Sequence, residues 1–179
     1  MQRYALSAIG RDRPGIVAAL TGVLLEHRLN IEDSQATILR GHFSIVLIVA
    51  APDGLDRDRL DADLERVADQ LELELISVDE VAQAAEEIIE PSHMVTVYGV
   101  DHPGIVHAAT QALADRGIDI TDLNTRLIEG EGEQPLYALM MEVAIPAEAG
   151  ATELERALDA VGRHEGVEVT LHELEQDEL

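Results

Sequence analysis

The sequence predicts an α+β protein built from two tandem units, each with the order strand, helix, strand, strand, helix, strand. The first indication is a repeat: residues 10–17 read GRDRPGIV and residues 99–106 read GVDHPGIV, 89 positions later in a chain of 179 residues. The second is that short apolar segments alternate with segments of helical apolar period in both halves. An internal repeat sets the architecture of a whole chain. Two copies are too few for a solenoid, so we expect paired domains.

The repeat extends well beyond the octet. Asn30-Ile31 matches Asp119-Ile120 at the same offset of 89, and Leu60 matches Leu154 at an offset of 94. The change of offset comes from five extra residues in the Gly/Glu-rich stretch 130–135 of the second copy, which fits a lengthened surface hairpin. We therefore expect one domain over residues 1–80, a linker over 81–92 and a second domain over 93–179.

In the first half of the first unit, residues 4–10 read as a short buried strand, followed by a turn at 11–13. Pro14 then suits the first position of a helix, where its missing N–H costs nothing. The helical stripe consists of Ile16, Val17, Leu20, Val23 and Leu24, and we expect it to end at Asn30.

The second half of the unit begins with a strand over 31–39 and a turn at 41–42. Phe43–Ala50 is nearly all apolar, as expected of a central strand. A break at 52–54 precedes a second helix, with the apolar stripe Leu60, Leu64, Val67 and Leu71. Glu72–Val78 alternates and reads as the fourth strand.

The second unit repeats this order. We expect strands over 94–99, 119–128, 136–145 and 167–173, and helices over 103–115 and 151–163. The order β-α-β-β-α-β is the ferredoxin-like split βαβ. It predicts a four-stranded antiparallel sheet with both helices on one face. The other face needs a cover, which a second copy of the unit could supply.

The composition limits the class of protein. Apolar residues make up 46% of the chain, which is typical of a globular protein. There are 36 acidic against 12 basic residues, all of them Arg, and the net charge of −24 argues against direct nucleic-acid binding. The charge indicates a solvated acidic surface, or alternatively a saline source. No apolar run reaches the ~18 residues of a membrane span, the start does not resemble a signal peptide, and Cys is absent. We expect a cytoplasmic protein without membrane contact.

A ferredoxin-like unit with Asp-x-Pro-Gly-Ile at its first strand–helix turn resembles the ACT domain. Residues 12–16 and 101–105 both carry this motif. Two tandem copies resemble the glycine cleavage system transcriptional repressor family. The resemblance implies that an amino acid, with glycine as the first guess, binds near this turn at an interface between ACT units. It also implies a transcription factor or another regulatory protein as partner.

Elementary chemistry supports a ligand at this turn. It leads into a helix N-terminus, where unpaired N–H groups and the positive end of the helix dipole receive a carboxylate. Gly15 and Gly104 let a ligand approach the backbone. The candidate ligand-binding residues are Asp12, Arg13, Pro14, Gly15, Ile16, Asn30, Ile31, Asp101, His102, Pro103, Gly104, Ile105, Asp119 and Ile120. The resemblance to ACT domains implies a ligand-contacting side chain just before the second strand, which is Asn30 in one copy and Asp119 in the other. Because an acid could hold an α-ammonium but would repel a carboxylate, we expect unequal sites and favour the first.

Each of these motifs also has a purely structural interpretation. Asp12 and Asp101 could cap the helices, and the Pro-Gly pairs could serve only the turn. Arg13 could pair with a carboxylate or be solvated. A metal site at Asp101, His102 and His107 is disfavoured, because histidines at i and i+5 do not share a helix face. We expect no metal and no cofactor.

The sequence favours a regulatory binding protein over an enzyme. Ser7 and Thr96 read as inward-facing polar positions rather than nucleophiles, and neither a Gly-x-Ser-x-Gly elbow nor a phosphate-binding loop occurs. The alternatives are a ligand-free ACT interaction or dimerisation module and, less in keeping with these observations, an enzyme acting alone. Exposed edge strands in sheets of this kind favour pairing, so we expect a homodimer.

Overall fold

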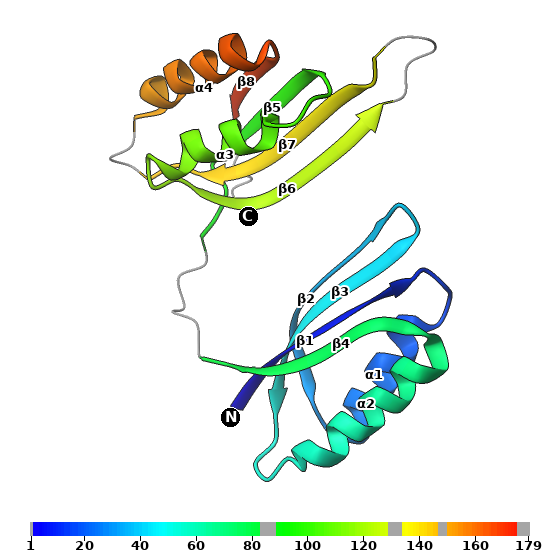
Figure 1. Cartoon of the computed structure of the whole chain (residues 1–179). Coiled ribbons are helices and arrows are strands. Elements are labelled where there is room, and N and C mark those ends of the chain that lie inside the picture. The colour runs from blue at the N-terminus through cyan, green and yellow to red at the C-terminus, as the bar shows by residue number, and fades with distance from the viewer. Residues whose placement is uncertain (1, 83–88, 129–133, 147–149, 175–179) are drawn as a thin grey trace. The chain divides into compact units, whose positions relative to one another are not determined.

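The computed structural model describes residues 2–82, 89–128, 134–146 and 150–174. The chain divides into two compact units, Met1–Glu86 and Glu87–Leu179. Over the described residues each unit has the order β-α-β-β-α-β, so the predicted α+β fold of two tandem ferredoxin-like units is confirmed (Figure 1). Residues 83–88 of the expected linker 81–92 and residues 130–133 of the Gly/Glu-rich stretch 130–135 lie outside the described residues.

In the first unit the sheet order is β2-β3-β1-β4, and every neighbouring pair is antiparallel. The elements are β1 (Gln2–Arg11), α1 (Ile16–Glu26), β2 (Asn30–Leu39), β3 (His42–Ala51), α2 (Arg57–Leu71) and β4 (Leu73–Val81). β3 is central, as its apolar sequence predicted. Both helices cover the same face of the sheet (Figure 1).

The second unit repeats the topology with the order β6-β7-β5-β8. Its elements are β5 (His93–Val100), α3 (Ile105–Ala114), β6 (Asp119–Ile128), β7 (Leu136–Ala144), α4 (Ala151–Glu165) and β8 (Glu168–Glu173). Each unit has its own apolar core between sheet and helices, because alternate strand residues point to the helices.

The alternation corrects one expectation, since Ser7 and Thr96 do not face the helical core. In β1 the neighbours Leu6 and Ala8 are buried beneath the helices, and Ser7 lies half-buried on the opposite face. In β5 the same holds for Thr96 between Val95 and Val97. A shift of one residue changes the face, and burial of the larger apolar neighbours decides which face Ser7 and Thr96 take.

The helix boundaries also differ from expectation. α1 begins at Ile16, and Pro14 belongs to the preceding turn rather than to the first helical position. The reason is Gly15, whose φ of 100° is left-handed and cannot belong to the helix. α3 likewise begins two residues after Pro103. Glu72, expected in a strand, is instead the left-handed C-cap of α2.

Candidate functional site

The repeated motif forms the same turn in both units. In the first, the Asp12 N–H donates to the Gly41 carbonyl at 2.9 Å, which ties the turn to the β2–β3 hairpin. In the second, the Asp101 N–H donates to the Pro135 carbonyl at 2.9 Å. The N-cap glycine follows, with φ of 117° at Gly104. Main-chain bonds therefore hold the turn whatever the side chains are.

Both helices that follow these turns lack a side-chain cap. Within the described part of the chain, no side chain accepts a hydrogen bond at the N-terminus of α1 or α3. α2 shows the contrast, since Asp56 accepts from the Arg59 N–H at 3.1 Å. The hypothesis that Asp12 and Asp101 cap the helices is wrong, because each lies three residues before the N-cap glycine. The first-turn N–H groups are left for an acceptor from outside the helix.

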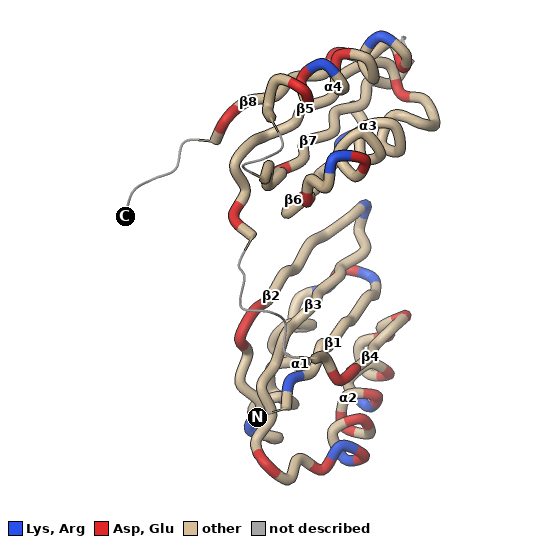
Figure 2. The backbone as a smooth tube through the Cα atoms, turned by 90° about the vertical axis from the view of Figure 1, so that its left-hand side faces the viewer, with Lys and Arg blue, Asp and Glu red and all other residues tan. Residues whose placement is uncertain are grey.

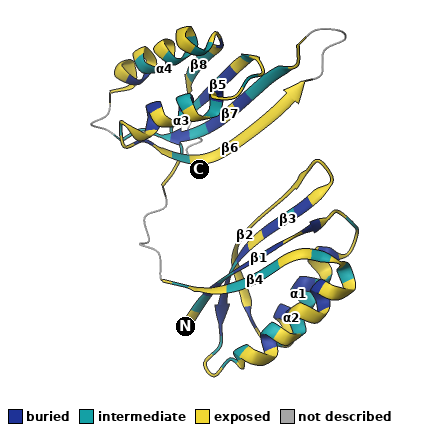
Figure 3. Cartoon of the chain, viewed as in Figure 1, coloured by how far each residue is buried: buried dark blue, intermediate teal, exposed yellow. Residues whose placement is uncertain are grey.

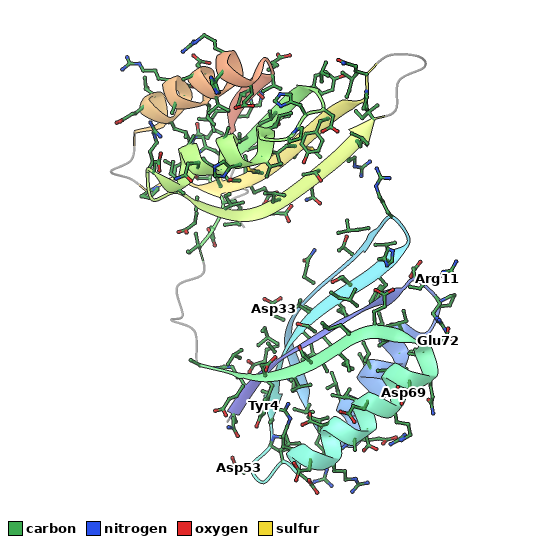
Figure 4. The ribbon with its side chains drawn as sticks, viewed as in Figure 1. Tyr4, Arg11, Asp33, Asp53, Asp69 and Glu72 are labelled. Carbon is green, nitrogen blue, oxygen red and sulfur yellow. The ribbon has the colours of Figure 1, made fainter. Side chains whose placement is uncertain are left out.

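The residue before the proline reaches across each unit to the end of its second helix. In the first unit Arg13 Nη2 donates to Glu72 Oε2 at 2.6 Å. In the second, His102 Nε2 lies 2.9 Å from the Glu165 carbonyl oxygen. These partners are 59 and 63 residues away in the sequence, which is why no local pattern indicates them. Figure 4 shows Glu72 beside Arg11, at the end of the first unit where the turn begins.

These contacts shift two pKa values in opposite directions. The hydrogen bond and positive charge of Arg13 hold the pKa of Glu72 below its ordinary value. Hydrogen bonds to the carbonyls of Pro103 and Glu165 raise the pKa of His102, with smaller contributions from the charges of Glu165 and Asp101. Both ring nitrogens of His102 lie within 3.1 Å of a carbonyl oxygen, so the arrangement favours the imidazolium.

A groove of ≈ 570 Å³ lies beside the turn of the second unit. It is lined by the predicted residues Asp101, His102, Pro103, Gly104 and Ile105, together with Val106, His107 and Tyr137. Its volume falls in the range of small-molecule sites. The structure thus brings five of the candidate residues together around a space that a ligand can enter.

Tyr137 was not among the candidates, although the sequence holds a signal for it. The chain has three Tyr and one Phe, and Tyr137 matches Phe43 at the offset of 94. Each lies directly opposite a glycine of the octet, Phe43 opposite Gly10 and Tyr137 opposite Gly99. Because the chain has few aromatic residues, an aromatic residue at the matched position of both units indicates a residue close to the turn.

The remaining candidates lie elsewhere. Asn30 pairs with Ala50, which pairs with Arg3 at the start of β1, whereas the turn follows Arg11 at its end. At ~3.3 Å per residue, roughly 26 Å of strand separates them. Figure 4 shows Tyr4 and Arg11 at opposite ends of this sheet. Ile31, Asp119 and Ile120 are separated from their turns in the same way. One ligand touching both sets would need a second copy of the fold.

Other kinds of site find no support in the described residues. Within these ranges no group of three or more His, Asp or Glu side chains could hold a metal ion. None of the described helices is long and apolar enough to cross a membrane. The acidic residues are spread over both units rather than gathered at one place (Figure 2).

Fold and turn together define a tandem ferredoxin-like protein with an uncapped glycine turn in each unit. A model of the ACT domain family matches residues 3–78 and 93–172, so the chain belongs to this family of regulatory domains and carries the domain twice. A UPF0237 protein of Methanopyrus kandleri is 38% identical over 77 residues, which are 42% of this chain and 86% of that protein. The phosphoserine phosphatase SerB2 of Mycobacterium tuberculosis is 25% identical over 171 residues, covering 94% of this chain but 40% of the enzyme.

Solved structures agree over the full chain. A protein of unknown function from Galdieria sulphuraria has a TM-score of 0.79 at 27% identity, with 97% of this chain and 99% of that one covered. A protein provisionally named glycine cleavage system transcriptional repressor has a TM-score of 0.75 at 19% identity, with 98% of each chain covered. At this identity the second likeness shows the fold alone.

Proposed function

We propose that the protein is a regulatory amino-acid-binding protein whose ligand places its α-carboxylate on the N-terminus of the helix that follows the glycine turn. The observation that carries the proposal is the turn itself, with a left-handed glycine at the N-cap and no capping side chain in the described residues of α1 and α3. Uncapped N–H groups and the helix dipole form a receptor for a carboxylate.

The groove of the second unit supplies the other groups that an amino acid needs. Asp101 lines the groove, and its carboxylate can receive the α-ammonium of an amino acid. The adjacent helix N-terminus receives the α-carboxylate, so the site as a whole favours a zwitterion. Val106 and the Tyr137 ring provide apolar surface for a side chain. Glycine, from the family resemblance, remains the first ligand to test.

The two turns are proposed to differ in affinity. The sequence favours the first where a second copy of the fold brings this position to the turn, since Asn30 would not repel a carboxylate as Asp119 would. The groove supports the second. Variants of both turns are therefore needed to assign the site.

We also propose that ligand binding controls contact with a regulatory protein, with a transcription factor as the first candidate. The net charge of −24 and the family resemblance support a protein partner rather than nucleic acid. A ligand with a hundredfold preference for one arrangement would shift the equilibrium by about 2.7 kcal/mol. The alternative is a ligand-free module, in which the ACT domains bind no amino acid and serve only interaction or dimerisation.

The experiment is thermal unfolding against each of the twenty amino acids, at low and at high salt. A ligand at 100 times its Kd adds about 2.7 kcal/mol of stability, a shift of several degrees. Asp101→Asn and Gly104→Val should abolish the response if the second turn binds, and Gly15→Val if the first does. Gly22→Ala is the control, because it lies within α1 and an added Cβ meets nothing within 4 Å. Absence of any responder at either salt concentration would favour the ligand-free module.

A further inference from the structure

The second turn has an acidic side chain close to it that the first turn lacks. A Cβ at Gly104 would lie 3.4 Å from Oε2 of Glu165, the last residue of α4, whereas a Cβ at Gly15 would meet no atom of the described residues within 4 Å. Glu165 matches Leu71 at the offset of 94, and Leu71 packs against the core of the first unit. The repeat therefore has a carboxylate beside one helix N-terminus and an apolar side chain at the matched position of the other unit.

The Glu165 carboxylate is shielded from solvent. α4 lies on the surface of its unit, and most of its residues are exposed (Figure 3). The side chain of Glu165 is an exception, with 15% of its area exposed. The acid that reaches the turn of the first unit, Glu72, is 79% exposed and is paired with Arg13. Because a shielded carboxylate is costly unless nearby groups compensate its charge, Glu165 depends on its surroundings more than Glu72 does.

Two kinds of positive charge lie near the Glu165 carboxylate. The first is imidazole: His102 Nδ1 is 3.7 Å from Oε2, and the largely exposed His164 Nε2 is 3.8 Å from Oε1. The second is the N-terminus of α3, which begins directly after Gly104 and carries roughly half a positive charge. His102 also contacts the main chain of Glu165, since its Nε2 lies 2.9 Å from the Glu165 carbonyl oxygen. These contacts hold the carboxylate at the second turn.

We propose that the carboxylate of Glu165 is the internal counter-charge of the α3 N-terminus and opposes the entry of a ligand carboxylate at the second turn. In the described part of the chain no side chain accepts a hydrogen bond from this N-terminus, so Glu165 acts through its charge. Asp12 and Asp101 are common to both turns, and the difference in charge therefore lies at Glu165 and Leu71.

The proposal makes the first turn the stronger receptor for a carboxylate. A ligand carboxylate that reaches α3 meets the like charge of Glu165, whereas one that reaches α1 meets the apolar Leu71 at the matched position. This consequence for ligand affinity rests on the proposed function. The counter-charge itself does not, because it concerns two groups of the same unit, and the tests below use no amino acid.

The first test follows the backbone amides of Ile105 and Val106 by NMR while the pH of the ligand-free full chain is lowered. Protonation of Glu165 should shift both amides in the wild type, because they lie at the helix end next to its charge. Glu165→Gln should remove this shift. The other titratable groups near the turn are unchanged in the variant, so the comparison isolates Glu165. Identical titration of the amides in both proteins would overturn the proposal.

The second test titrates acetate, the simplest stable carboxylate with an apolar end, into the chain near neutral pH and follows the amides of both turns. Glu165→Gln, and Glu165→Leu with the side chain of the first unit, should lower the Kd for acetate at the second turn by roughly three- to tenfold, the size of a charge effect at a helix end. Neither variant should change the first turn. An unchanged or absent response at the second turn of both variants would overturn the proposal.

The matched control for both tests is Glu155→Gln. Glu155 is an exposed residue of α4, ten positions before Glu165 and so about 15 Å away along the helix. Its substitution removes the same charge from the chain and should leave the amide titration and the acetate affinity as in the wild type. An effect equal to that of Glu165→Gln would mean that net charge alone is responsible, and would also overturn the proposal.

The outcomes separate the counter-charge from the proposed function. A chain that shows both effects of Glu165 but is stabilised by none of the twenty amino acids would contradict the proposed function and leave the counter-charge supported. A chain that responds to an amino acid, but whose Ile105 and Val106 amides do not depend on Glu165, would contradict the counter-charge and leave the proposed function supported.

Discussion

The turns of the two units have the same backbone but different anchors. In the first, the guanidinium of Arg13 holds the carboxylate of Glu72. In the second, His102 contacts two carbonyl oxygens and lies 3.7 Å from the carboxylate of Glu165. The comparison teaches that the side chain at this position reaches the end of the second helix in both units, although its identity and its partner atom differ.

The helical cores differ in a similar way. Leu20 of α1 is fully buried, and its match at the offset of 89 is Ala109 of α3, which is also fully buried. The same place in the fold thus holds a large side chain in one unit and a small one in the other. Each core is closely packed around the side chain it has, which leads to the first prediction.

Leu20→Ala should cause the largest loss of stability, about 2–5 kcal/mol, because it leaves a cavity that Ala109 does not leave in the second unit. Ala109→Leu should cost about 1–3 kcal/mol through overpacking. Urea denaturation measures both. The control is Leu25→Ala, since Leu25 is 77% exposed and its truncation should change little. A neutral Leu20→Ala would mean that the first core can close around the gap.

The glycines at the ends of β1 and β5 offer a second comparison. A Cβ at Gly99 would lie 2.6 Å from Val167 Cγ1, and one at Gly10 would lie 2.8 Å from Leu73 Cδ2. We expect Gly99→Ala and Gly10→Ala to cost about 1–3 kcal/mol each, with the larger loss at Gly99 because Val is stiffer at χ1 than Leu. Denaturant unfolding of both variants checks this order, and the reverse order would contradict it.

Asp119→Asn should make the second ligand site resemble the first. If a second copy of the fold brings Asp119 to the turn and its carboxylate repels that of the ligand, its removal should lower the Kd of the second site roughly several-fold, the size of a screened charge interaction. Calorimetric titration measures the change. Asn30→Asp is the reciprocal control, and it should weaken the first site. Unchanged affinity in both variants would place these residues outside the ligand site.

The smallest expected effect is a difference in pH dependence between the two turns. The raised pKa of His102 means that its stabilising contribution is complete below pH 6.5 and is lost as the pH rises through its folded-state pKa. The lowered pKa of Glu72 means that its contribution is complete above pH 4.5 and is lost as the pH falls through its folded-state pKa. The Glu72 side chain is exposed and that of His102 is partly exposed, so screening by solvent keeps the effects small.

His102→Arg should remove the loss of stability on the alkaline side, since it gives the second turn the donor of the first. Arg13→Ala should remove the loss on the acidic side. Urea unfolding at a series of pH values measures both, and a titration of His102 by NMR follows the imidazole directly. An NMR titration with the pKa of His102 below 6.5 would contradict the contacts with Pro103 and Glu165.

The repeat, the order of elements and the position of both turns were predictable from the sequence. The apolar stripe of α1, the apolar run of β3 and the recurring octet are local patterns, and the period of a helix or strand is itself local. The exposed edges were predictable too, because a sheet of this order always leaves two strands outermost.

The tertiary structure alone decided how these pieces meet. The partners of Arg13 and His102, the Tyr137 wall of the groove, and the distance between Asn30 and the turn all depend on strand register and on residues far apart in the chain. Even the face taken by Ser7 depends on which neighbours the helices cover. A local pattern reports which residues share an element, whereas contacts between elements arise only when the sheet aligns them.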